Sequence, residues 1–304
     1  MASFLYNTCN FALHVFRIKR FLGKDDSDFD KIVANLEKRQ HIKSPSRKLK
    51  KKYEYKEKQL GGQPCYCFRP KDKKIERAVL LFFGGGYLIP PSKEDFSLAG
   101  EIAEHTRAEV YLPMYPLAPK YKLIDIASSV IDVYKEMLHH YKSQKIIFMG
   151  SSSGTAFCLI LCLYISHEKL TLPFPSRLIM ISPGLQMPPN EVQIKRMKKQ
   201  ERKDVVIPIT FCKNIHCILV DESSSYLLRA FDSSWVGMPE MDIFYGDQEL
   251  FYSYIPDIDK AVKEGNVRAH IHIGKNMMHC WPMLGFTREG KKTRVDIYKI
   301  IQSI

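Results

Sequence analysis

The sequence has no uninterrupted apolar run that reaches the roughly 20 residues a membrane-spanning helix needs. Its longest apolar stretches, 155–166 and 177–183, are both shorter than that. It also lacks the order of a secretory signal peptide, because the apolar N-terminal stretch precedes its basic residues and no small-residue cleavage site follows. We therefore expect a cytoplasmic protein without a membrane span, in which residues 1–22 form a helix of the mature fold. Anchoring of that helix on a membrane surface is the alternative.

Paired cysteine motifs are also missing, although the chain contains eight cysteines. No two of them have the C-x-x-C spacing of a structural zinc site. Cys65 and Cys67 have strand spacing, and Cys158 and Cys162 are one helical turn apart. A disulfide framework is typical of short secreted chains rather than of a chain of 304 residues. We therefore predict buried free thiols in a reducing compartment and no metal site.

Acidic residues are scarce relative to basic ones, since 33 Asp and Glu stand against 46 Lys and Arg and leave a formal net charge of +13. Residues 1–58 carry much of the excess, with 15 basic against 7 acidic residues, and a second basic cluster spans 195–203. Basic runs can mark contact with nucleic acids or anionic membranes. No nucleic-acid-binding motif accompanies them, and no aromatic residues are interleaved in 195–203. We therefore predict a solvated basic face and no nucleic-acid partner.

Apolar residues, in contrast, make up 45% of the chain and fall into segments that alternate between strand and helix patterns. Such alternation indicates a largely parallel sheet covered by helices on both faces, which is the α/β class. The expected strands are 77–83, 109–115, 145–150, 177–182, 240–246 and 267–273, and the expected helices are 95–106, 123–141, 154–167 and 290–303.

Four further segments depart from this alternation. A helical pattern spans 28–40, whereas 44–52 is polar enough to be a connector. Two strand-like segments flank Gln-Leu-Gly-Gly at 59–62 and predict an antiparallel hairpin at one edge of the sheet. The gap between 183 and 239 is too long for a plain connection and predicts an inserted helical subdomain.

The most informative motif is the run Gly-Ser-Ser-Ser-Gly at 150–154, which matches G-x-S-x-G with Ser152 at its centre. It follows an apolar strand pattern and opens an apolar helix, which is the context that a nucleophile elbow requires. Glycine at both flanking positions lets a cramped turn close without a side-chain clash, and Ser152 would then be exposed at the helix N-terminus. An ordinary flexible Gly/Ser turn is the alternative.

Three glycines, Gly84, Gly85 and Gly86, come directly after the expected strand 77–83. No Walker lysine follows them and the G-x-G-x-x-G spacing is absent, which disfavours phosphate binding. Backbone N–H groups in a glycine loop can approach a developing negative oxygen closely, so the loop predicts an oxyanion hole.

Titratable residues follow two other expected strands. Asp247 and Glu249 come after strand 240–246, and His279 comes after the last strand. Because active sites form at the carboxyl ends of parallel strands, we expect these residues to meet Ser152. The chain order of serine, acid and histidine is the order found in α/β-hydrolases.

Taken together, these segments resemble the hormone-sensitive-lipase-like esterases of the α/β-hydrolase fold. That family carries His-Gly-Gly-Gly, Tyr-Arg-Leu-Ala-Pro and G-x-S-x-G stretches, which correspond here to 83–86, 115–119 and 150–154. The resemblance covers about 75–304. It implies a carboxylesterase that cleaves small or short-acyl esters and needs no cofactor, and a homodimer is left open.

The resemblance also implies a division into core and cap. The core would be an α/β-hydrolase fold, with a mostly parallel sheet and an N-terminal antiparallel hairpin, formed by 43–183 and 237–304. A helical cap would combine 1–42 with 184–236. Such a cap covers the strand ends, so it would shape the substrate pocket.

Carried over position by position, the resemblance implies a catalytic triad. Ser152 would be the nucleophile, and His279 would be the general base and acid. The family's acid falls on Glu249 when it is counted from Gly246, and Asp247 is the fallback. The backbone N–H groups of the oxyanion hole would belong to Gly85, Gly86 and Ser153.

Two departures from the family pattern concern the support of these loops. Phe83 replaces the histidine of the glycine motif, and 182–187 lacks a common aspartate. Since the oxyanion donors are backbone groups, we expect activity to be retained in altered form. A ligand-binding member of the fold with impaired catalysis is the alternative, and Phe83 is the residue that favours it. Three apolar residues near the motifs belong either to the substrate pocket or to the core: Tyr87, Met278 and Trp281.

Overall fold

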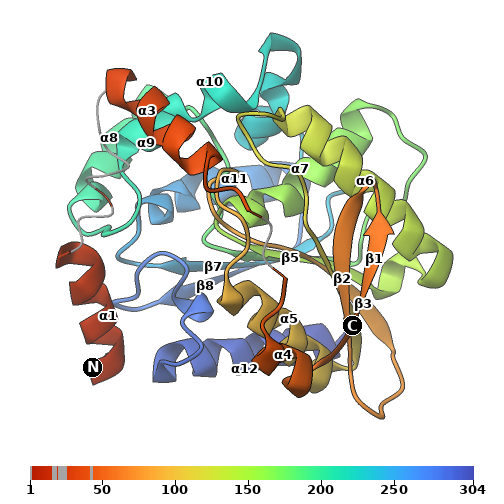
Figure 1. Ribbon diagram of the computed structural model, residues 1–304. Coiled ribbons are helices and arrows are strands. Elements are labelled where there is room, and N and C mark those ends of the chain that lie inside the picture. The colour runs from red at the N-terminus through yellow and green to blue at the C-terminus, as the bar shows by residue number, and fades with distance from the viewer. Residues whose placement is uncertain (1, 16–18, 20–25, 42–43) are drawn as a thin grey trace.

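An eight-stranded sheet forms the centre of the computed structural model, which describes residues 2–15, 19, 26–41 and 44–304 (Figure 1). The strands follow the order β1-β2-β4-β3-β5-β6-β7-β8 across the sheet. Neighbouring strands from β4 to β8 are parallel, so the predicted, largely parallel α/β sheet is confirmed. The strand bounds are β1 Glu54–Leu60, β2 Gln63–Arg69, β3 Arg77–Phe82, β4 Ala108–Pro113, β5 Ile146–Ser151, β6 Arg177–Ile181, β7 Glu240–Gly246 and β8 Ala269–Gly274.

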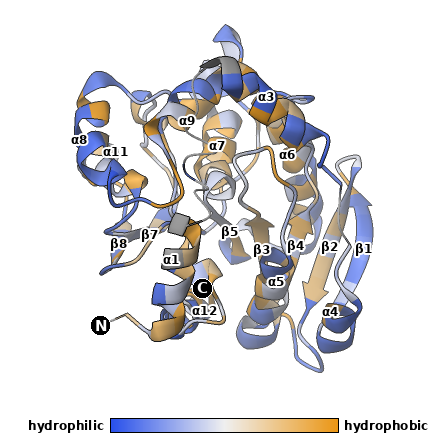
Figure 2. Cartoon of the chain, turned by 60° about the vertical axis from the view of Figure 1, so that its left-hand side comes forward, coloured by the Kyte–Doolittle hydropathy of each residue, from blue (hydrophilic) through white to orange (hydrophobic). Residues whose placement is uncertain are grey.

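β1 and β2 form the predicted antiparallel hairpin at one edge of the sheet. Leu60 pairs with Gln63 across a two-residue turn in which Gly61 and Gly62 have φ values of 58° and 73°. Glycine adopts this backbone without a Cβ clash, and it suits the twist of a tight hairpin. β1 is largely polar and exposed (Figure 2), which discourages pairing with the edge of another sheet.

Helices cover both faces of the sheet (Figure 1). α5 (Lys93–Thr106) and α12 (Arg288–Gln302) pack together on one face, and α6 (Leu123–His140) and α7 (Ser153–His167) pack together on the other. α7 is buried around most of its circumference because the sheet, α6 and the segment after β6 all contact it. α11 (Ile255–Gly265), which we did not anticipate, makes the helical connection that the parallel strands β7 and β8 require.

The segment between β6 and β7 is helical, as predicted. Its helices are α8 (Glu191–Glu201), α9 (Ile209–Asn214) and α10 (His216–Leu219). α3 (Asp26–Glu37), from the N-terminal part of the chain, packs against it through an edge-on contact of Phe29 with Phe211, whose ring centroids are 6.2 Å apart. Figure 1 shows α3, α8, α9 and α10 gathered at one end of the molecule. This segment, 184–236, is called the β6–β7 insertion below.

α1 (Phe4–Val15) lies within the predicted helix 1–22, of which 1, 16–18 and 20–22 lie outside the described residues. It lies apart from α3 and beside the C-terminal part of the chain (Figure 1). Within the described ranges, no helix is long and apolar enough to cross a bilayer.

The prediction that 44–52 is a connector is wrong, because α4 occupies Arg47–Lys52. Ser46 is its N-cap, and the Ser46 side chain accepts a hydrogen bond from the Leu49 N–H group. Such a cap satisfies one of the backbone donors that a helix start leaves free. Lys and Arg also have good helix propensity, which their charge obscured in the sequence.

All eight cysteines are free. The prediction of buried thiols holds for five of them, while Cys9 and Cys280 are half-buried and Cys217 is exposed. Burial raises the pKa of the Cys158 thiol well above its usual range, which keeps it protonated and unreactive. The five buried cysteines are Cys65, Cys67, Cys158, Cys162 and Cys212.

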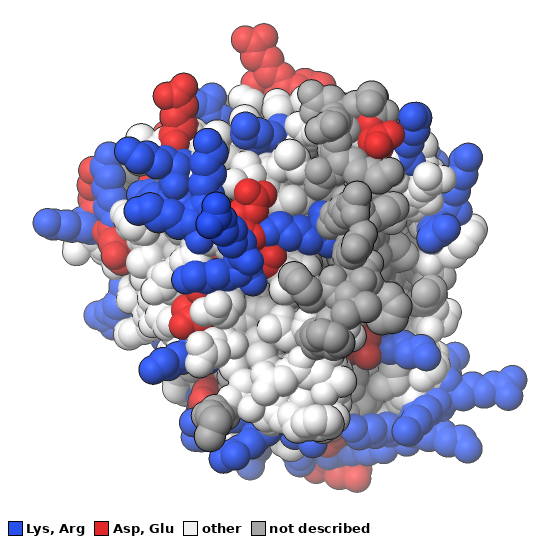
Figure 3. All heavy atoms as spheres, turned by 90° about the vertical axis from the view of Figure 1, so that its left-hand side faces the viewer, with Lys and Arg blue, Asp and Glu red and all other residues white. Residues whose placement is uncertain are grey.

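Basic side chains gather on the face of the molecule that α8 occupies (Figure 3). Arg196 is ion-paired with Asp257, which ties α8 to α11. The remaining basic residues of the cluster are exposed and form no ion pair with another described residue. The cluster therefore agrees with the predicted solvated basic face. Its exposed members are Lys195, Lys198, Lys199, Arg202 and Lys203.

Candidate active site

Ser152 lies in the turn between the carboxyl end of β5 and the start of α7. Its φ and ψ of 52° and −125° fall in a region that residues with a side chain rarely adopt. The turn requires small neighbours, since a Cβ added at Gly150 would lie 2.6 Å from the carbonyl carbon of Gly154. A Cβ added at Gly154 would lie 2.5 Å from the carbonyl oxygen of Phe82. Sterics therefore explain both glycines of the motif.

Three side chains from different strand ends meet at this turn. His279 Nε2 is 2.8 Å from Ser152 Oγ, and His279 Nδ1 is 2.7 Å from Glu249 Oε2. Both distances are those of hydrogen bonds. Glu249 is 0% and His279 7% exposed, so little water weakens their interaction. The arrangement can move a proton from Ser152 to His279 while the carboxylate holds the imidazole.

Asp247, the other acid that follows β7, does not contact His279. Its Oδ1 accepts hydrogen bonds from the Asn276 N–H group at 2.7 Å and from Gln248 Nε2 at 2.8 Å. The Asp247 carboxylate thus holds the turn after β8. Of the two acids that follow β7, only Glu249 contacts His279 within the described chain.

Ser182, directly after β6, contacts both Glu249 and the loop that carries His279. Its hydroxyl donates a 3.0 Å hydrogen bond to Glu249 Oε1 and accepts a 2.9 Å bond from the Cys280 N–H group. The Gly246 N–H group donates a second bond to the same carboxylate oxygen at 2.7 Å. Sequence reasoning missed this role of Ser182. The available signal was its position at the carboxyl end of a parallel strand.

The environment shifts the pKa of both partners of the buried pair. Burial raises the pKa of the Glu249 carboxyl above its usual range, although the hydrogen bond from His279 opposes this. Burial by itself lowers the pKa of His279, but the neighbouring Cys280 and Glu249 side chains outweigh it and the pKa lies well above its usual value. A stabilised imidazolium is what a proton acceptor in acyl transfer needs.

The glycine loop after β3 lies against the serine turn. A Cβ added at Gly84 would lie 3.2 Å from the Ser152 Cβ. The N–H groups of Gly85, Gly86 and Ser153 donate to no other atom of the described residues. Ser153 begins α7, and the first N–H groups of a helix have no partner within it. These donors are therefore available to a negative oxygen beside Ser152.

Phe83 supports the glycine loop through a partner of its own. Its ring stacks on Tyr115 with centroids 4.0 Å apart and planes inclined by 2°. The Tyr115 hydroxyl donates a 2.5 Å hydrogen bond to the Phe83 carbonyl oxygen. Both side chains are buried. The aromatic pair thus occupies the place where the motif has a histidine.

A cavity of about 510 Å³ opens onto Ser152 and His279. Its charged lining residues, apart from His279, are Glu94 and Asp95, and no Lys or Arg of the described chain lines it. A second cavity of about 520 Å³ is lined by Phe83, and its lining includes none of Ser152, Glu249 and His279. The apolar lining of the first cavity comprises Leu36, Tyr87, Leu88, Ile89, Met187, Val206, Ile207, Phe211, Phe251, Met283, Leu284 and Phe286.

A model of the alpha/beta hydrolase fold family matches residues 79–283, which is about two thirds of the chain. The match includes the glycine loop, the serine turn, Glu249 and His279. The chain belongs to this family. The search of curated proteins finds no match. Among the described residues of this hydrolase, no group of three His, Cys, Asp or Glu could hold a metal ion.

Solved structures share the fold of this hydrolase over nearly their whole length. EstE5, in a crystal soaked with p-nitrophenyl butyrate, is 20% identical in sequence to this chain. The superposition covers 99% of both chains and has a TM-score of 0.82. An esterase/lipase from an uncultured bacterium is also 20% identical, with 99% of each chain covered and a TM-score of 0.80. An esterase of the bacterial hormone-sensitive lipase family is 16% identical. The superposition covers 100% of this chain and 99% of that esterase, with a TM-score of 0.79.

The three residues expected in the pocket or the core have different places in the hydrolase. Tyr87 lines the cavity. Met278 and Trp281 do not, and both are buried in the core. Cys280, between Met278 and Trp281, has a φ of 56°, a left-handed conformation, and itself lines the cavity. The Trp281 indole N–H group then donates to the Thr293 hydroxyl of α12 at 3.1 Å.

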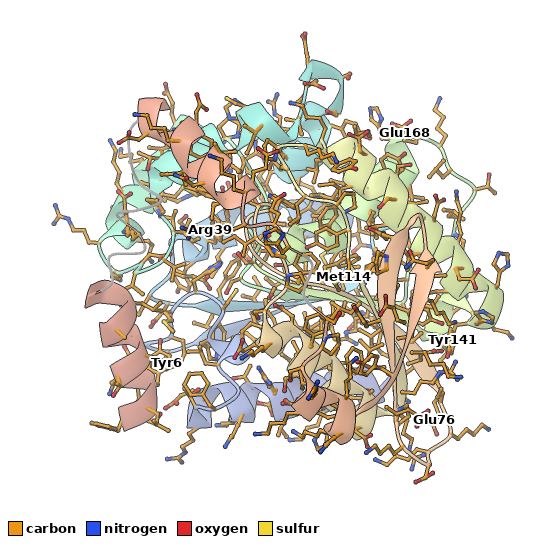
Figure 4. The ribbon with its side chains drawn as sticks, in the orientation of Figure 1. Tyr6, Arg39, Glu76, Met114, Tyr141 and Glu168 are labelled. Atoms are coloured by element: carbon orange, nitrogen blue, oxygen red, sulfur yellow. The ribbon has the colours of Figure 1, made fainter. Side chains whose placement is uncertain are left out.

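α1 braces the loop that carries His279 from outside. Tyr6 points from α1 toward the C-terminal segment (Figure 4), and its hydroxyl accepts a 2.6 Å hydrogen bond from the Met278 N–H group. Ser3 donates to the Glu289 carboxylate of α12 through its N–H at 2.6 Å and its hydroxyl at 2.7 Å. The N-terminal helix thus contacts the residue that precedes His279. Its apolar sequence gave no sign of this partner.

Proposed function

We propose that this hydrolase is a serine carboxylesterase that cleaves neutral esters with small or short acyl groups. The observation that carries the proposal is the chain of hydrogen bonds from Ser152 through His279 to the buried Glu249. Support also comes from the unpaired N–H groups beside Ser152 and from the esterases that share the fold. The first half of the reaction forms an acyl-enzyme, and the second half hydrolyses it.

In the first half, Ser152 Oγ attacks the ester carbonyl carbon while its proton passes to His279 Nε2. The N–H groups of Gly85, Gly86 and Ser153 bind the negative oxygen of the tetrahedral intermediate. The bond to the alcohol oxygen then breaks, and His279 gives the proton to the leaving alcohol. Glu249 holds the imidazole tautomer throughout and stabilises the imidazolium.

In the second half, water takes the place of the alcohol. His279 Nε2 accepts a proton from the water as its oxygen attacks the acyl carbon. The intermediate collapses, the bond to Ser152 Oγ breaks, and His279 returns the proton to Ser152. The products are a carboxylic acid and the regenerated enzyme, and no cofactor takes part.

The proposed substrate class is inferred from the side chains that line the cavity. Apolar side chains from α3, the glycine loop and the β6–β7 insertion favour apolar acyl and alcohol groups. Glu94 and Asp95 disfavour a substrate carboxylate or phosphate there, because no basic side chain of the described residues lines the cavity. We accordingly propose 1–42 and 184–236 as the cap, and 43–183 with 237–304 as the catalytic core.

Turnover of p-nitrophenyl acetate and butyrate tests the proposal. The wild type is expected to hydrolyse both esters, and Ser152→Ala is expected to lower kcat by about 10⁴-fold or more. A fluorophosphonate probe is expected to add one label to the wild type and none to Ser152→Ala. The control is Ser225→Ala, because the Ser225 hydroxyl bonds the Glu222 carbonyl on the outer side of the insertion.

Absence of both turnover and labelling in folded wild-type protein would overturn the esterase proposal. It would favour the alternative, a ligand-binding member of the fold with impaired catalysis. The replacement of the family's histidine by Phe83 is the one sequence feature that supports this alternative. Turnover that survives in Ser152→Ala would instead assign the reaction to another nucleophile.

A further inference from the structure

Asp204 lies in the β6–β7 insertion, three residues after the end of α8, and its side chain has several buried partners. The residue is 3% exposed. Its Oδ1 accepts hydrogen bonds from the Val206 and Ile207 N–H groups at 2.6 and 2.9 Å. Its Oδ2 accepts a 2.6 Å hydrogen bond from the Leu250 N–H group, 46 residues away in the sequence. One carboxylate therefore joins the insertion to the segment after β7.

Both sides of this link belong to the candidate active site. Val206 and Ile207 line the cavity that opens onto Ser152. Leu250 directly follows Glu249 and begins a short 3-10 helix, Leu250–Tyr254. The Asp204 carboxylate therefore connects the backbone of the cavity wall to the backbone of the residue next to Glu249.

The surrounding contacts make the link stiff. Lys19 Nζ donates to the Asp204 carbonyl oxygen at 2.9 Å and also to the Glu201 carbonyl oxygen. The Glu201 carboxylate accepts a 3.0 Å hydrogen bond from the Ile209 N–H group at the start of α9. The turn from α8 to α9 is thus held from several directions, and Asp204 is its hydrogen-bonded link to the residue after Glu249.

The charge of Asp204 also acts on the triad. Burial is the largest cause of the raised pKa of Glu249, and the negative charge of Asp204 raises it further. The other titratable groups around Asp204 are Lys19 and Glu201 on its own side and Cys212 on α9. Removing the charge of Asp204 would therefore ease the ionisation of Glu249.

We propose that Asp204 is a positioning residue that couples the cavity wall at Val206 and Ile207 to Glu249, so that an acyl chain packed on this wall improves the alignment of the triad. This inference rests on the proposed esterase function. On this proposal a butyryl chain contacts the wall more than an acetyl group does, because it extends further from the carbonyl carbon. The coupling therefore makes the catalytic rate, and not only binding, depend on the acyl chain.

The substitution Asp204→Asn tests the coupling at nearly constant volume. The amide oxygen can still accept from Val206 and Ile207, but the amide nitrogen cannot accept from the Leu250 N–H group. We expect kcat for p-nitrophenyl butyrate to fall roughly tenfold or more, with a smaller loss for the acetate and KM changed by less than about threefold. The acid limb of the kcat/KM profile is expected to move to lower pH, because a negative charge near the Glu249–His279 pair is lost.

Two variants separate coupling from general damage. Asp221→Asn changes a carboxyl of the same insertion whose side chain is 67% exposed, and it is expected to leave both esters and the pH profile unchanged. Asp204→Glu keeps the charge but lengthens the link, so the ratio of butyrate to acetate turnover should fall while the acid limb stays. This variant also tests the proposal if Asp204→Asn does not fold.

Amide hydrogen exchange gives a readout that needs no turnover. The peptide that contains Leu250 is expected to exchange at least roughly tenfold faster in Asp204→Asn than in the wild type, with no change in Asp221→Asn. Equal losses for acetate and butyrate, an unmoved acid limb or unchanged exchange at Leu250 would overturn the inference. Inactive wild-type protein would instead refute the proposed function, and the exchange result would still decide whether Asp204 holds the segment beside Glu249.

Discussion

Glu249 Oε2 and His279 Nδ1 lie 2.7 Å apart in a site where both side chains are almost completely buried. The other oxygen of the same carboxylate accepts hydrogen bonds from Ser182 Oγ and the Gly246 N–H group. A buried carboxylate with partners on both oxygens has little freedom to rotate. The pair therefore fixes which imidazole nitrogen faces Ser152.

Replacing Glu249 with Gln is expected to lower kcat about 10⁴-fold, because the amide cannot hold the productive imidazole tautomer or stabilise the imidazolium. Hydrolysis of p-nitrophenyl butyrate measures the effect. Asp247→Asn is the matched control, since Asp247 bonds Asn276 and Gln248 instead of His279. It should leave kcat within roughly tenfold of the wild type. A larger loss in Asp247→Asn than in Glu249→Gln would assign the acid to Asp247.

The pH profile of kcat/KM should fall on its acid side at a pH above about 6.5, the ordinary pKa of histidine. His279 acts as a base only when neutral, and its pKa is raised, so activity is lost as the pH falls through that raised value. Initial rates from roughly pH 5 to 9, read at the isosbestic wavelength of p-nitrophenol, give the profile. In Glu249→Gln the limb should move to lower pH, because the carboxylate that favours the imidazolium is gone. A limb that stays in place in this variant contradicts the assignment.

Ser182→Ala removes one hydrogen bond to the Glu249 carboxylate and leaves the Cys280 N–H group without its acceptor. Hydrogen bonds to charged groups contribute about 1.5–3 kcal/mol, so kcat should fall roughly 10- to 100-fold with little change in KM. Ser253→Ala is the control, because the buried Ser253 hydroxyl has no partner among the described residues. Equal kinetics in the two variants would show that Ser182 does not position the triad.

Tyr115→Phe deletes the donor that holds the Phe83 carbonyl oxygen while keeping the aromatic stack. We expect the free energy of unfolding to fall by about 1–2 kcal/mol and kcat to fall roughly tenfold, because the glycine loop loses a fixed point. Tyr134→Phe loses a partly buried hydrogen bond of the same kind, to the Pro173 carbonyl oxygen at 2.7 Å, away from that loop. It should lose comparable stability in urea denaturation but keep its kcat. A parallel loss of kcat in both variants would mean that the effect is one of stability alone.

Local patterns in the sequence were enough to predict most of the fold. Apolar segments of strand and helix length predicted the parallel sheet, and Gly61-Gly62 predicted the hairpin turn. The glycines at 150 and 154 predicted the turn of Ser152, because the G-x-S-x-G spacing follows an apolar strand pattern, although the space at Gly154 is limited by the distant carbonyl oxygens of Phe82 and Phe83. α4 was missed because its lysines hid a capped helical turn, whereas α11 was missed although its eleven residues form an amphipathic helix.

The sequence by itself therefore determined the succession of strands and helices and the positions of the serine turn and the glycine loop, because each motif directly follows an apolar strand pattern. Tertiary structure alone decided that Glu249 and not Asp247 contacts His279, and that Tyr87 but not Met278 or Trp281 lines the cavity. It also brought Ser182 and Asp204 to the segment around Glu249. These contacts join residues tens of positions apart, and their direction depends on how each strand end turns. Cys280, for example, adopts a left-handed φ of 56° directly after His279, a conformation that a residue with a side chain rarely adopts and that the sequence pattern did not indicate.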